Sequence, residues 1–463
     1  MTLADKLNLG CLCRTLSPER LRQQLETDAT LKGMAASLAA SHPHLFSESA
    51  VFLDPAINTT LAQAIAAIER AIALPAYQQH ALSAAPDIAR LDFGPASVFM
   101  GYDFHLGEDG PRLIEINTNA GGALLNAALA RAHRDCCAPM QGLMDANSDL
   151  TGLDDTFVAM FRSEWQAQRG TAPLRSVLIV DDAPDDQYLA PEFALARQLF
   201  LAHGLSAAVG DARDFEWKDG ALWHPALPDQ AVDLVYNRLT DFSLSEPTHA
   251  ALRAAYVAGA AVVTPHPRAH ALFADKRNLI TLGDDALLAS WGVSAEDRRL
   301  LQAVVPRTEL VKAEDADALW ARRRQLFFKP VAGYGGKAAY RGEKLTKTVW
   351  AHITAGGFIA QALVPPSERL VDVDGVATRL KLDIRAYTYR GQVQLLAART
   401  YTGQTTNFRT AGGGFSPVVV LPVGPDKARL TVRPELVEGS SPCQGASTGP
   451  VLSPSKGSAR TQL

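Results

Sequence analysis

The pattern of apolar and polar residues predicts helices over residues 1–90 and a mixture of strands and helices further along the chain. Residues 60–74 (TLAQAIAAIERAIAL) carry apolar side chains at helical spacing. Ser17 followed by Pro18 predicts a helix start, since serine caps a helix and proline suits its first position. Residues 176–180 (SVLIV) and 232–238 (VDLVYNR) are apolar runs separated by a helical pattern, which favours a parallel sheet covered by helices.

Strand-like alternation predicts two hairpins. Residues 100–122 read MGYDFHLGEDGPRLIEINTNAGG, with a charged turn at residues 107–110. Because alternate residues of a strand share a face, Glu115 and Asn117 point the same way, and Asp103 falls near them if the strands pair. The second hairpin, residues 380–401, turns at Arg390-Gly391 and carries Arg385 and Arg399 on its strands.

Composition narrows the class of protein. Apolar residues make up 47% and charged residues 20% of the chain, as in soluble globular proteins. A net charge of −4, with no basic block, gives no sign of a nucleic-acid partner. No apolar run reaches membrane-spanning length and the N-terminus lacks a signal-peptide pattern, so we expect a cytoplasmic protein with no membrane partner. Five cysteines form neither a disulfide framework nor a zinc-binding pattern.

The first hairpin offers a set of metal ligands. Asp103, Glu115 and Asn117 would present hard oxygens, the ligands that Mg²⁺ prefers when phosphate and water complete its octahedron. The alternative is an exposed hairpin whose acids are solvated.

A second group of motifs suits phosphate binding. Residues 329–337 (KPVAGYGGK) form a glycine-rich turn whose backbone can approach phosphate oxygens, although it is not a Walker A loop. Lys276 precedes it, and an apolar strand suited to an adenine edge follows it. Arg385 and Arg399 could neutralise a transferring phosphoryl group. Arg238, at the end of an apolar strand, is either a substrate-carboxylate ligand or part of a surface ion pair.

Together these motifs resemble the ATP-grasp superfamily in its circularly permuted form, as in eukaryotic-type glutathione synthetase and glutathionylspermidine synthetase. Residues 114–118 (IEINT) are similar to the metal-binding strand of those enzymes, and Asp103 stands twelve positions before Glu115, as in their pattern. Here the metal strand precedes the lysine and glycine-loop motifs, which indicates permutation. The resemblance covers residues 100–122 and 232–420.

The resemblance implies roles for individual residues. Asp103, Glu115 and Asn117 would hold Mg²⁺ against ATP, while Lys276 and Lys329 would contact its phosphates or adenine. Arg385 would stabilise an acyl phosphate, with Arg399 beside it, and Arg238 would touch the substrate. The remaining nucleotide-binding residues would form a lid loop, which contains Gly333, Gly335 and Gly336. The adenine pocket would be lined by Gln361, Ala362, Leu363 and Val364.

The resemblance also implies an α/β fold: a permuted α+β ATP-grasp core, an inserted parallel-sheet substrate domain and a small lid. We expect the chain to divide into an N-terminal helical region (1–95), a first part of the core with the metal hairpin (96–170), a Rossmann-like substrate domain (171–265), the rest of the core with its lid (266–424) and a disordered tail (425–463).

Two departures from the family pattern bear on the substrate. Tyr334 and glycines stand where those synthetases carry an arginine and a glutamate in the lid loop. Gly101 stands where the polyamine enzyme has an arginine, two positions before the aspartate. Glutathione chemistry therefore does not follow from the resemblance.

The sequence thus predicts an ATP-dependent ligase that activates a small carboxylate as an acyl phosphate and joins it to an amine. Two alternatives remain open: an ATP-binding protein without turnover, and a phosphotransferase acting on a non-carboxylate acceptor. The identity of the acid and the amine is not encoded in these motifs, and neither is the choice between a monomer and a homodimer.

Overall fold

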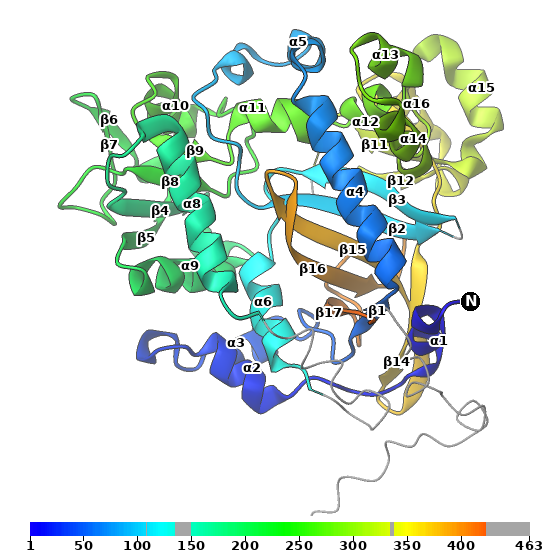
Figure 1. The fold of residues 1–463 in the computed structure, drawn as a ribbon, viewed down its shortest axis with the longest axis horizontal. Coiled ribbons are helices and arrows are strands. Elements are labelled where there is room, and N and C mark those ends of the chain that lie inside the picture. The colour runs from blue at the N-terminus through cyan, green and yellow to red at the C-terminus, as the bar shows by residue number, and fades with distance from the viewer. Residues whose placement is uncertain (108, 135–149, 334–337, 423–463) are drawn as a thin grey trace, which may run out of the picture.

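The computed structural model describes residues 1–107, 109–134, 150–333 and 338–422. It is an α/β structure with a large central sheet, a parallel sheet to one side and a small sheet above (Figure 1). The predicted tail, 425–463, lies outside the described residues. Within the described part, no helix is both long and apolar enough to cross a membrane.

The central sheet has seven strands in the order β1-β17-β16-β15-β2-β3, with β14 paired to the first part of β15, on the side where β2 pairs with its later part. All neighbours are antiparallel except β1 and β17. The strands are β1 (Val51–Leu53), β2 (Met100–Gly107), β3 (Gly110–Asn117), β14 (Ser367–Val373), β15 (Val376–Tyr389), β16 (Gln392–Tyr401) and β17 (Gly414–Val420). Both predicted hairpins are present, as β2–β3 and β15–β16.

The hairpin turn at Arg390-Gly391 follows from its residues. Both have positive φ, 47° and 73°, as a tight two-residue hairpin turn requires. Ile384 and Ala386 face a core shared with helix α4, whereas Tyr387 faces the opposite core. Both faces of β15 are therefore covered, although alternation alone predicts one apolar and one solvated face.

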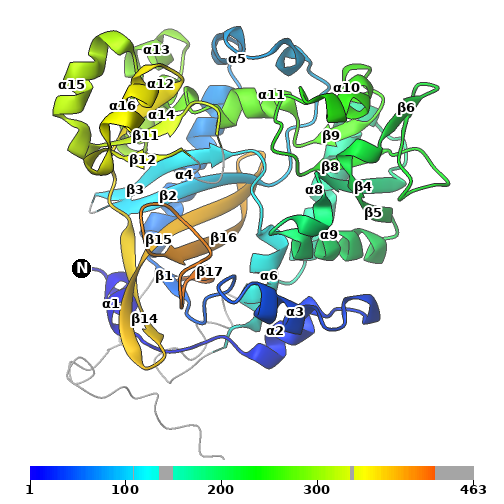
Figure 2. The same cartoon turned by 180° about the vertical axis from the view of Figure 1, so that it is seen from behind.

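Helices of the N-terminal region pack around this sheet. Figure 2 shows α4 passing behind the central strands, with α1 near the end of β14. The predicted caps are formed: the Ser17 hydroxyl accepts from the Arg20 N–H, with Pro18 at the first helical position. The helices are α1 (Leu3–Gly10), α2 (Pro18–Leu25), α3 (Met34–Ser41), α4 (Pro55–Ile72), α5 (Pro75–Ser83) and α6 (Ala123–Ala132).

The parallel sheet has the order β5-β4-β8-β9 and is flanked by helices, as the strand–helix–strand pattern predicts. One of its faces contributes to the core that also contains Tyr387 and α6. Its elements are α8 (Leu153–Arg169), β4 (Ser176–Asp181), α9 (Ala190–Ala202), β5 (Ser206–Asp211), β8 (Leu234–Asn237), α10 (Ala250–Val257) and β9 (Val262–Thr264), with a small β6–β7 ribbon (Glu216–Lys218, Ala221–Trp223).

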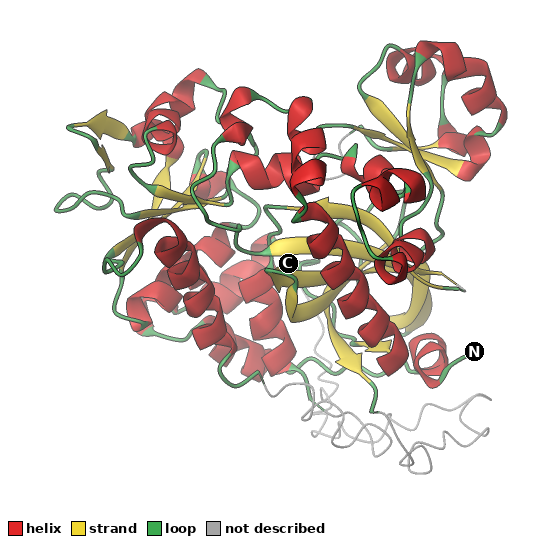
Figure 3. Cartoon of the chain, turned by 45° about the horizontal axis from the view of Figure 1, so that its top comes forward, coloured by secondary structure: helices red, strands yellow, loops and turns green. Residues whose placement is uncertain are grey.

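The small sheet, order β10-β13-β11-β12, is antiparallel and carries helices on one side (Figure 3). It has its own apolar core, which includes Phe328, Ile353 and Phe358. The elements of this region are α11 (Pro267–Ala269), α12 (Asn278–Leu282), α13 (Asp285–Ser290), α14 (Ala295–Val304), β10 (Thr308–Leu310), α15 (Ala316–Ala321), β11 (Leu326–Pro330), β12 (Tyr340–Arg341), α16 (Lys347–Thr354) and β13 (Phe358–Ala362).

A buried carboxylate ties these parts together. Glu164 of α8 is fully buried. It accepts hydrogen bonds from the N–H groups of Ala96 and Ser97, both at 2.8 Å, from the Thr264 hydroxyl at 2.7 Å and from the Tyr389 hydroxyl at 2.9 Å. These donors belong to the segment before β2, to β9 and to β15, so one side chain joins three parts of the fold.

Replacing Glu164 with alanine should lower the free energy of unfolding by about 3 kcal/mol, because two buried and two half-buried donors lose their acceptor. Urea denaturation followed by tryptophan fluorescence measures the change. Glu216→Ala, which breaks only an exposed pair with Lys218, is the matched control and should change stability by less than about 0.5 kcal/mol. Equal stability of the two variants would contradict the role given to Glu164.

Candidate functional site

One face of the central sheet, where β3, β2, β15 and β16 lie side by side (Figure 1), carries five of the predicted site residues: Asp103, Glu115, Asn117, Arg385 and Arg399. Asp103 is the register partner of Glu115 on one side and of Arg385 on the other. The pairing shifts register directly after Asp103, so Asp103 lies opposite Glu115 while Phe104 lies opposite Leu113. Pairing across three strands thus places residues that are far apart in sequence on a common face.

Asp103 is the centre of an ionic cluster. Its carboxylate is 1% exposed and accepts from Arg385 Nε and Nη2, both at 2.6 Å, in a bidentate pair. Arg399 Nη2 donates to the same carboxylate at 2.8 Å. Burial by itself would raise the pKa of Asp103, but the two guanidinium groups outweigh it and hold that pKa well below its ordinary value.

A second buried acid fixes Arg399. Asp383, 1% exposed, accepts from Arg399 Nε at 2.7 Å and from the Thr406 hydroxyl at 2.6 Å. Sequence reasoning did not assign Asp383 a role. Its position two residues before Arg385, on the same face of the strand, is the signal that would have found it.

The predicted metal ligands converge. Asn117 Nδ2 lies 3.2 Å from Asp103 Oδ2 and 3.3 Å from Glu115 Oε1. Two carboxylates and an amide are oxygen donors of the kind that Mg²⁺ takes, and turning the amide would present its oxygen in place of its nitrogen. In the described ranges there is no group of three or more His, Cys, Asp or Glu residues able to hold a metal, so the set fits Mg²⁺ only with Asn117 included.

Lys329 lies beside this cluster. Lys329 on β11 donates from Nζ to the Ile114 carbonyl at 2.8 Å and to Gln361 Oε1 at 2.9 Å. Burial lowers the pKa of Lys329 to about 8, opposed by Glu115 and Asp103 and reinforced by Lys276. Because Glu115, Asp103 and Lys276 all act on the charge of Lys329, the acids of the first hairpin and the two lysines share one local environment.

The described residues include only part of the predicted lid loop. Lys276 Nζ donates to the Gly333 carbonyl at 2.7 Å, which ties this lysine to the start of the glycine turn. Gly335 and Gly336 lie outside the described residues.

The backbone at the end of β13 differs from the expected adenine edge. The amides of Ala362 and Leu363 donate to the carbonyls of Arg307 and Gln325, both at 2.8 Å, so they are not free to face a ligand. The Val364 carbonyl accepts from the His105 ring at 2.8 Å. Gln361 Nε2 is buried without a hydrogen-bond partner, so it is one donor available here.

His105 is a further site residue that the sequence did not indicate. It continues the face of Asp103 along β2, and its ring also lies 3.4 Å from the Tyr401 hydroxyl. Burial lowers the pKa of His105, so the ring is neutral near pH 7. A neutral ring next to Lys329 and Arg399 adds no further positive charge to the cluster.

Arg238 lies just past the end of β8 and is 7% exposed, so its alternative role in a surface ion pair is wrong. Its Nη1 donates to Asn119 Oδ1, two residues beyond Asn117. Glu192 lies close by and accepts from the N–H groups of Gly122 at 2.7 Å and Leu124 at 3.1 Å, which caps α6 from another segment. Arg238 therefore adjoins the loop after the metal strand but makes no direct contact with Asp103.

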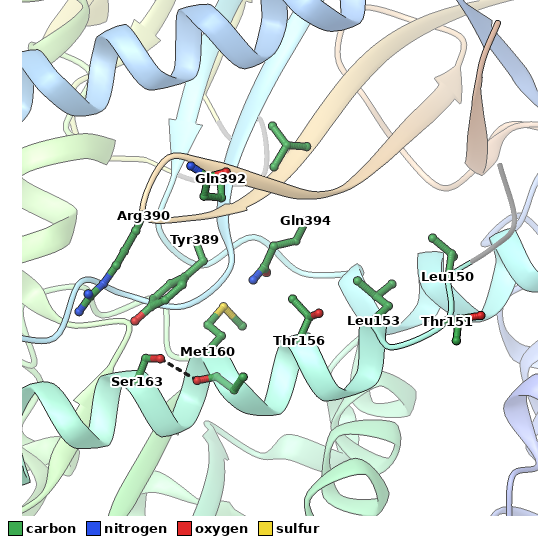
Figure 4. Close-up of a pocket in the computed structure, with 12 residues that line it drawn as sticks. Leu150, Thr151, Leu153, Thr156, Met160, Ser163, Tyr389, Arg390, Gln392 and Gln394 are labelled. Carbon is green, nitrogen blue, oxygen red and sulfur yellow. Dashed lines mark hydrogen bonds between the residues drawn. The ribbon is translucent and has the colours of Figure 1, made fainter. Parts of the chain in front are cut away.

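A groove of about 600 Å³ lies elsewhere, between α8 and the turn of the β15–β16 hairpin (Figure 4). Its walls include Met160, Tyr389 and Gln394. No predicted site residue within the described ranges lines it, so it is separate from the ionic cluster.

Comparisons with known proteins bear on the fold. No protein-family model matches the chain, and no curated protein matches it. Among solved structures, a glutathione synthetase-like effector from Globodera pallida in its apo form aligns with a TM-score of 0.52 at 11% identity, covering 88% of this chain and 98% of that one.

Two further structures align less well. A gamma-glutamylcysteine synthetase-like protein from Methylobacillus flagellatus has a TM-score of 0.43 at 11% identity, covering 77% of this chain and 84% of that one. The ATP-grasp ligase PsnB with a precursor peptide and AMPPNP has a TM-score of 0.29 at 15% identity, covering 52% of this chain and 87% of that one. The first alignment shows that the chain shares the overall α/β fold of that glutathione synthetase-like effector.

Proposed function

We propose that this protein is an ATP-dependent ligase that joins a small carboxylate to an amine through an acyl phosphate. The observation that carries the proposal is the convergence of Asp103, Glu115 and Asn117 on the central sheet, with Lys329 of the small sheet bonded to the Ile114 carbonyl beside Glu115. Phosphoryl transfer needs charge neutralisation and positioning, and this cluster provides both. The glutathione synthetase-like fold supports the proposal at a coarse level.

Each group has a part in the reaction. Lys329 and Lys276 bind the phosphates of ATP, and Gln361 binds the adenine side through Nε2, which has no partner in the protein. Glu115 and Asn117, with Asp103, would hold Mg²⁺, which when bound supplies charge neutralisation to the phosphates. Both oxygens of Asp103 already accept from arginines, so Glu115 and Asn117 are the less encumbered ligands.

The proposed chemistry has two steps. An oxygen of the substrate carboxylate attacks the γ-phosphorus, the bond to ADP breaks, and Arg385 and Arg399 stabilise the charge on the transferring group. The amine nitrogen then attacks the acyl carbon, phosphate leaves and the nitrogen loses a proton. Arg238 binds a substrate carboxylate next to the metal strand.

Two other functions are distinguishable from this one. An ATP-binding protein without turnover is favoured by the lid loop, where the resembled family carries an acid and this chain has Tyr334 and glycines. A phosphotransferase would move phosphate to an acceptor that is not a carboxylate.

Incubation with MgATP, a panel of carboxylic acids and hydroxylamine should give a hydroxamate together with an equal amount of ADP, because hydroxylamine captures an acyl phosphate. Colorimetric hydroxamate detection and coupled ADP detection are the measurements. Glu115→Gln, assayed in parallel, should lose both products by at least about a hundredfold. ADP without hydroxamate points to a phosphotransferase, and neither product across the panel points to the non-catalytic alternative.

Nucleotide affinity should fall as the pH rises through about 8, the pKa of Lys329. The ammonium is present below that pKa and binds phosphate, whereas the neutral amine above it does not. We expect the dissociation constant for AMPPNP, measured by calorimetry, to rise about tenfold across the transition. Lys329→Arg should remove this dependence, since arginine stays charged. A wild-type dependence that persists in Lys329→Arg would assign it to another group.

Arg385→Ala should lower kcat by about a hundredfold to a thousandfold while the AMPPNP dissociation constant changes little, because this guanidinium acts on charge that develops during transfer. Steady-state ADP release and calorimetry separate the two effects. Arg390→Ala, an exposed arginine at the turn of the same hairpin, is the matched control and should behave as wild type. Unchanged kcat in Arg385→Ala would remove this residue from the proposed reaction.

A further inference from the structure

A buried histidine stands between two aspartates beside the parallel sheet. The side chain of His249 is 0% exposed. Its Nδ1 lies 2.9 Å from Asp241 Oδ2, and its Nε2 lies 2.9 Å from Asp182 Oδ1. Asp182 directly follows β4, Asp241 belongs to the segment after β8, and His249 directly precedes α10. One imidazole ring therefore joins three segments of the chain.

The geometry requires two protons on this ring. A neutral imidazole carries one N–H, so one of its nitrogens would present a lone pair to a carboxylate oxygen. The imidazolium donates from both nitrogens and satisfies both acids. Burial alone would lower the pKa of His249, but the bonds to Asp182 and Asp241 outweigh it and raise that pKa.

Other charged groups of the elements packed around the ring bond elsewhere or stand apart from it. In the described part of the chain the basic groups and their partners are Arg213 with Asp211, Lys218 with Glu216, Arg238 with Asn119, and Arg253 with the carbonyls of Ser243 and Leu244. The acids there that make no hydrogen bond with the ring, again among described residues, are Asp181, Asp211, Asp214, Glu216 and Glu246. Burial and the two bonded carboxylates are therefore the main influences on the charge of the ring.

The two carboxylates are held unequally. The Asp241 side chain is 6% exposed and also accepts from the N–H of Glu246 at 2.8 Å and from the Ser245 hydroxyl at 3.1 Å. The Asp182 side chain is 47% exposed, so water can solvate its carboxylate when it leaves the ring. A ring that loses one proton should therefore keep its bond to Asp241 and release Asp182.

We propose that His249 is a pH-operated clamp on the loop after β4: its imidazolium holds Asp182, and loss of the Nε2 proton to solvent frees Asp182 and this loop. The clamp is closed at low pH, because the imidazolium is then fully populated. It opens as the pH rises through the pKa of the folded-state ring, which lies above the ordinary value of histidine.

The loop held by the clamp reaches a second loop next to the ionic cluster. Tyr188 lies in the same loop as Asp182, is 40% exposed and stacks on Phe408, with ring centroids 5.6 Å apart. Phe408 belongs to the connection between β16 and β17, whose Thr406 donates to Asp383. Opening the clamp would therefore loosen a contact between the parallel sheet and the segment that supports the ionic cluster.

Hydrogen exchange of the full chain, followed by mass spectrometry, tests the clamp. The measured quantity is the protection factor of a peptide spanning residues 181–189, with the intrinsic pH dependence of exchange divided out. As the pH rises from about 6 to about 9, a range that spans histidine titration, we expect this protection to fall by at least about tenfold. The measurement needs no substrate, so its result is independent of the proposed ligase activity.

Two substitutions separate the clamp from a merely structural contact. In Asp182→Asn the amide can accept from the imidazolium or donate to the neutral ring, so protection should stay high across the whole range. In Asp182→Ala neither bond forms, so protection should be low across the whole range. Asp186→Asn is the matched control, because Asp186 is an exposed acid of the same loop, and it should keep the wild-type pH dependence.

Peptides from α8, followed in the same samples, show whether each variant is folded. Constant protection of residues 181–189 in the wild-type protein over this range overturns the clamp, whatever the variants do. A pH-dependent fall that persists unchanged in Asp182→Asn overturns it as well, because another group would then control the loop.

Discussion

The structure depends on one buried carboxylate that two arginines neutralise. Asp103 has almost no access to water, and its charge is tolerable only because Arg385 and Arg399 bond to both of its oxygens. The three residues lie on three adjacent strands, so this ion cluster both requires and fixes the order β2-β15-β16. Asp383 extends the cluster and holds Arg399 from the other side. The same groups that satisfy one another provide the charges that phosphoryl transfer would use.

Lysine contacts connect this cluster to the small sheet. Lys329 spans from β11 to the carbonyl of Ile114 on β3, and Lys276 holds the beginning of the glycine turn. In the proposed reaction a polyphosphate would raise the lowered pKa of Lys329, because a nearby anion favours the charged form of the amine. The parallel sheet contributes differently: Arg238, the residue after β8, bonds to Asn119 in the loop that follows β3.

The sequence by itself determined the local elements. Period-two alternation predicted both hairpins, and the Arg390-Gly391 pair predicted the turn of the second one. Ser17 and Pro18 predicted a helix start that the structure confirms. The sequence predicted that Asp103 falls near Glu115 if the strands pair, but regular pairing from the turn would place Asp103 opposite Ile114. The register shift after Asp103, which the sequence did not indicate, brings it opposite Glu115. The α/β class followed from strand–helix–strand runs.

Only the tertiary structure decided which faces are covered and which distant strands are neighbours. Alternation on β15 does not reveal that its polar face is also buried, which is why Asp383 was missed, just as His105 was missed on β2. The sequence suggested that the backbone N–H groups of Ala362 and Leu363 would face adenine, but in the fold they donate to the carbonyls of Arg307 and Gln325. The reason is physical: local patterns report the period of a segment, whereas burial and charge pairing depend on non-local contacts that the period does not encode.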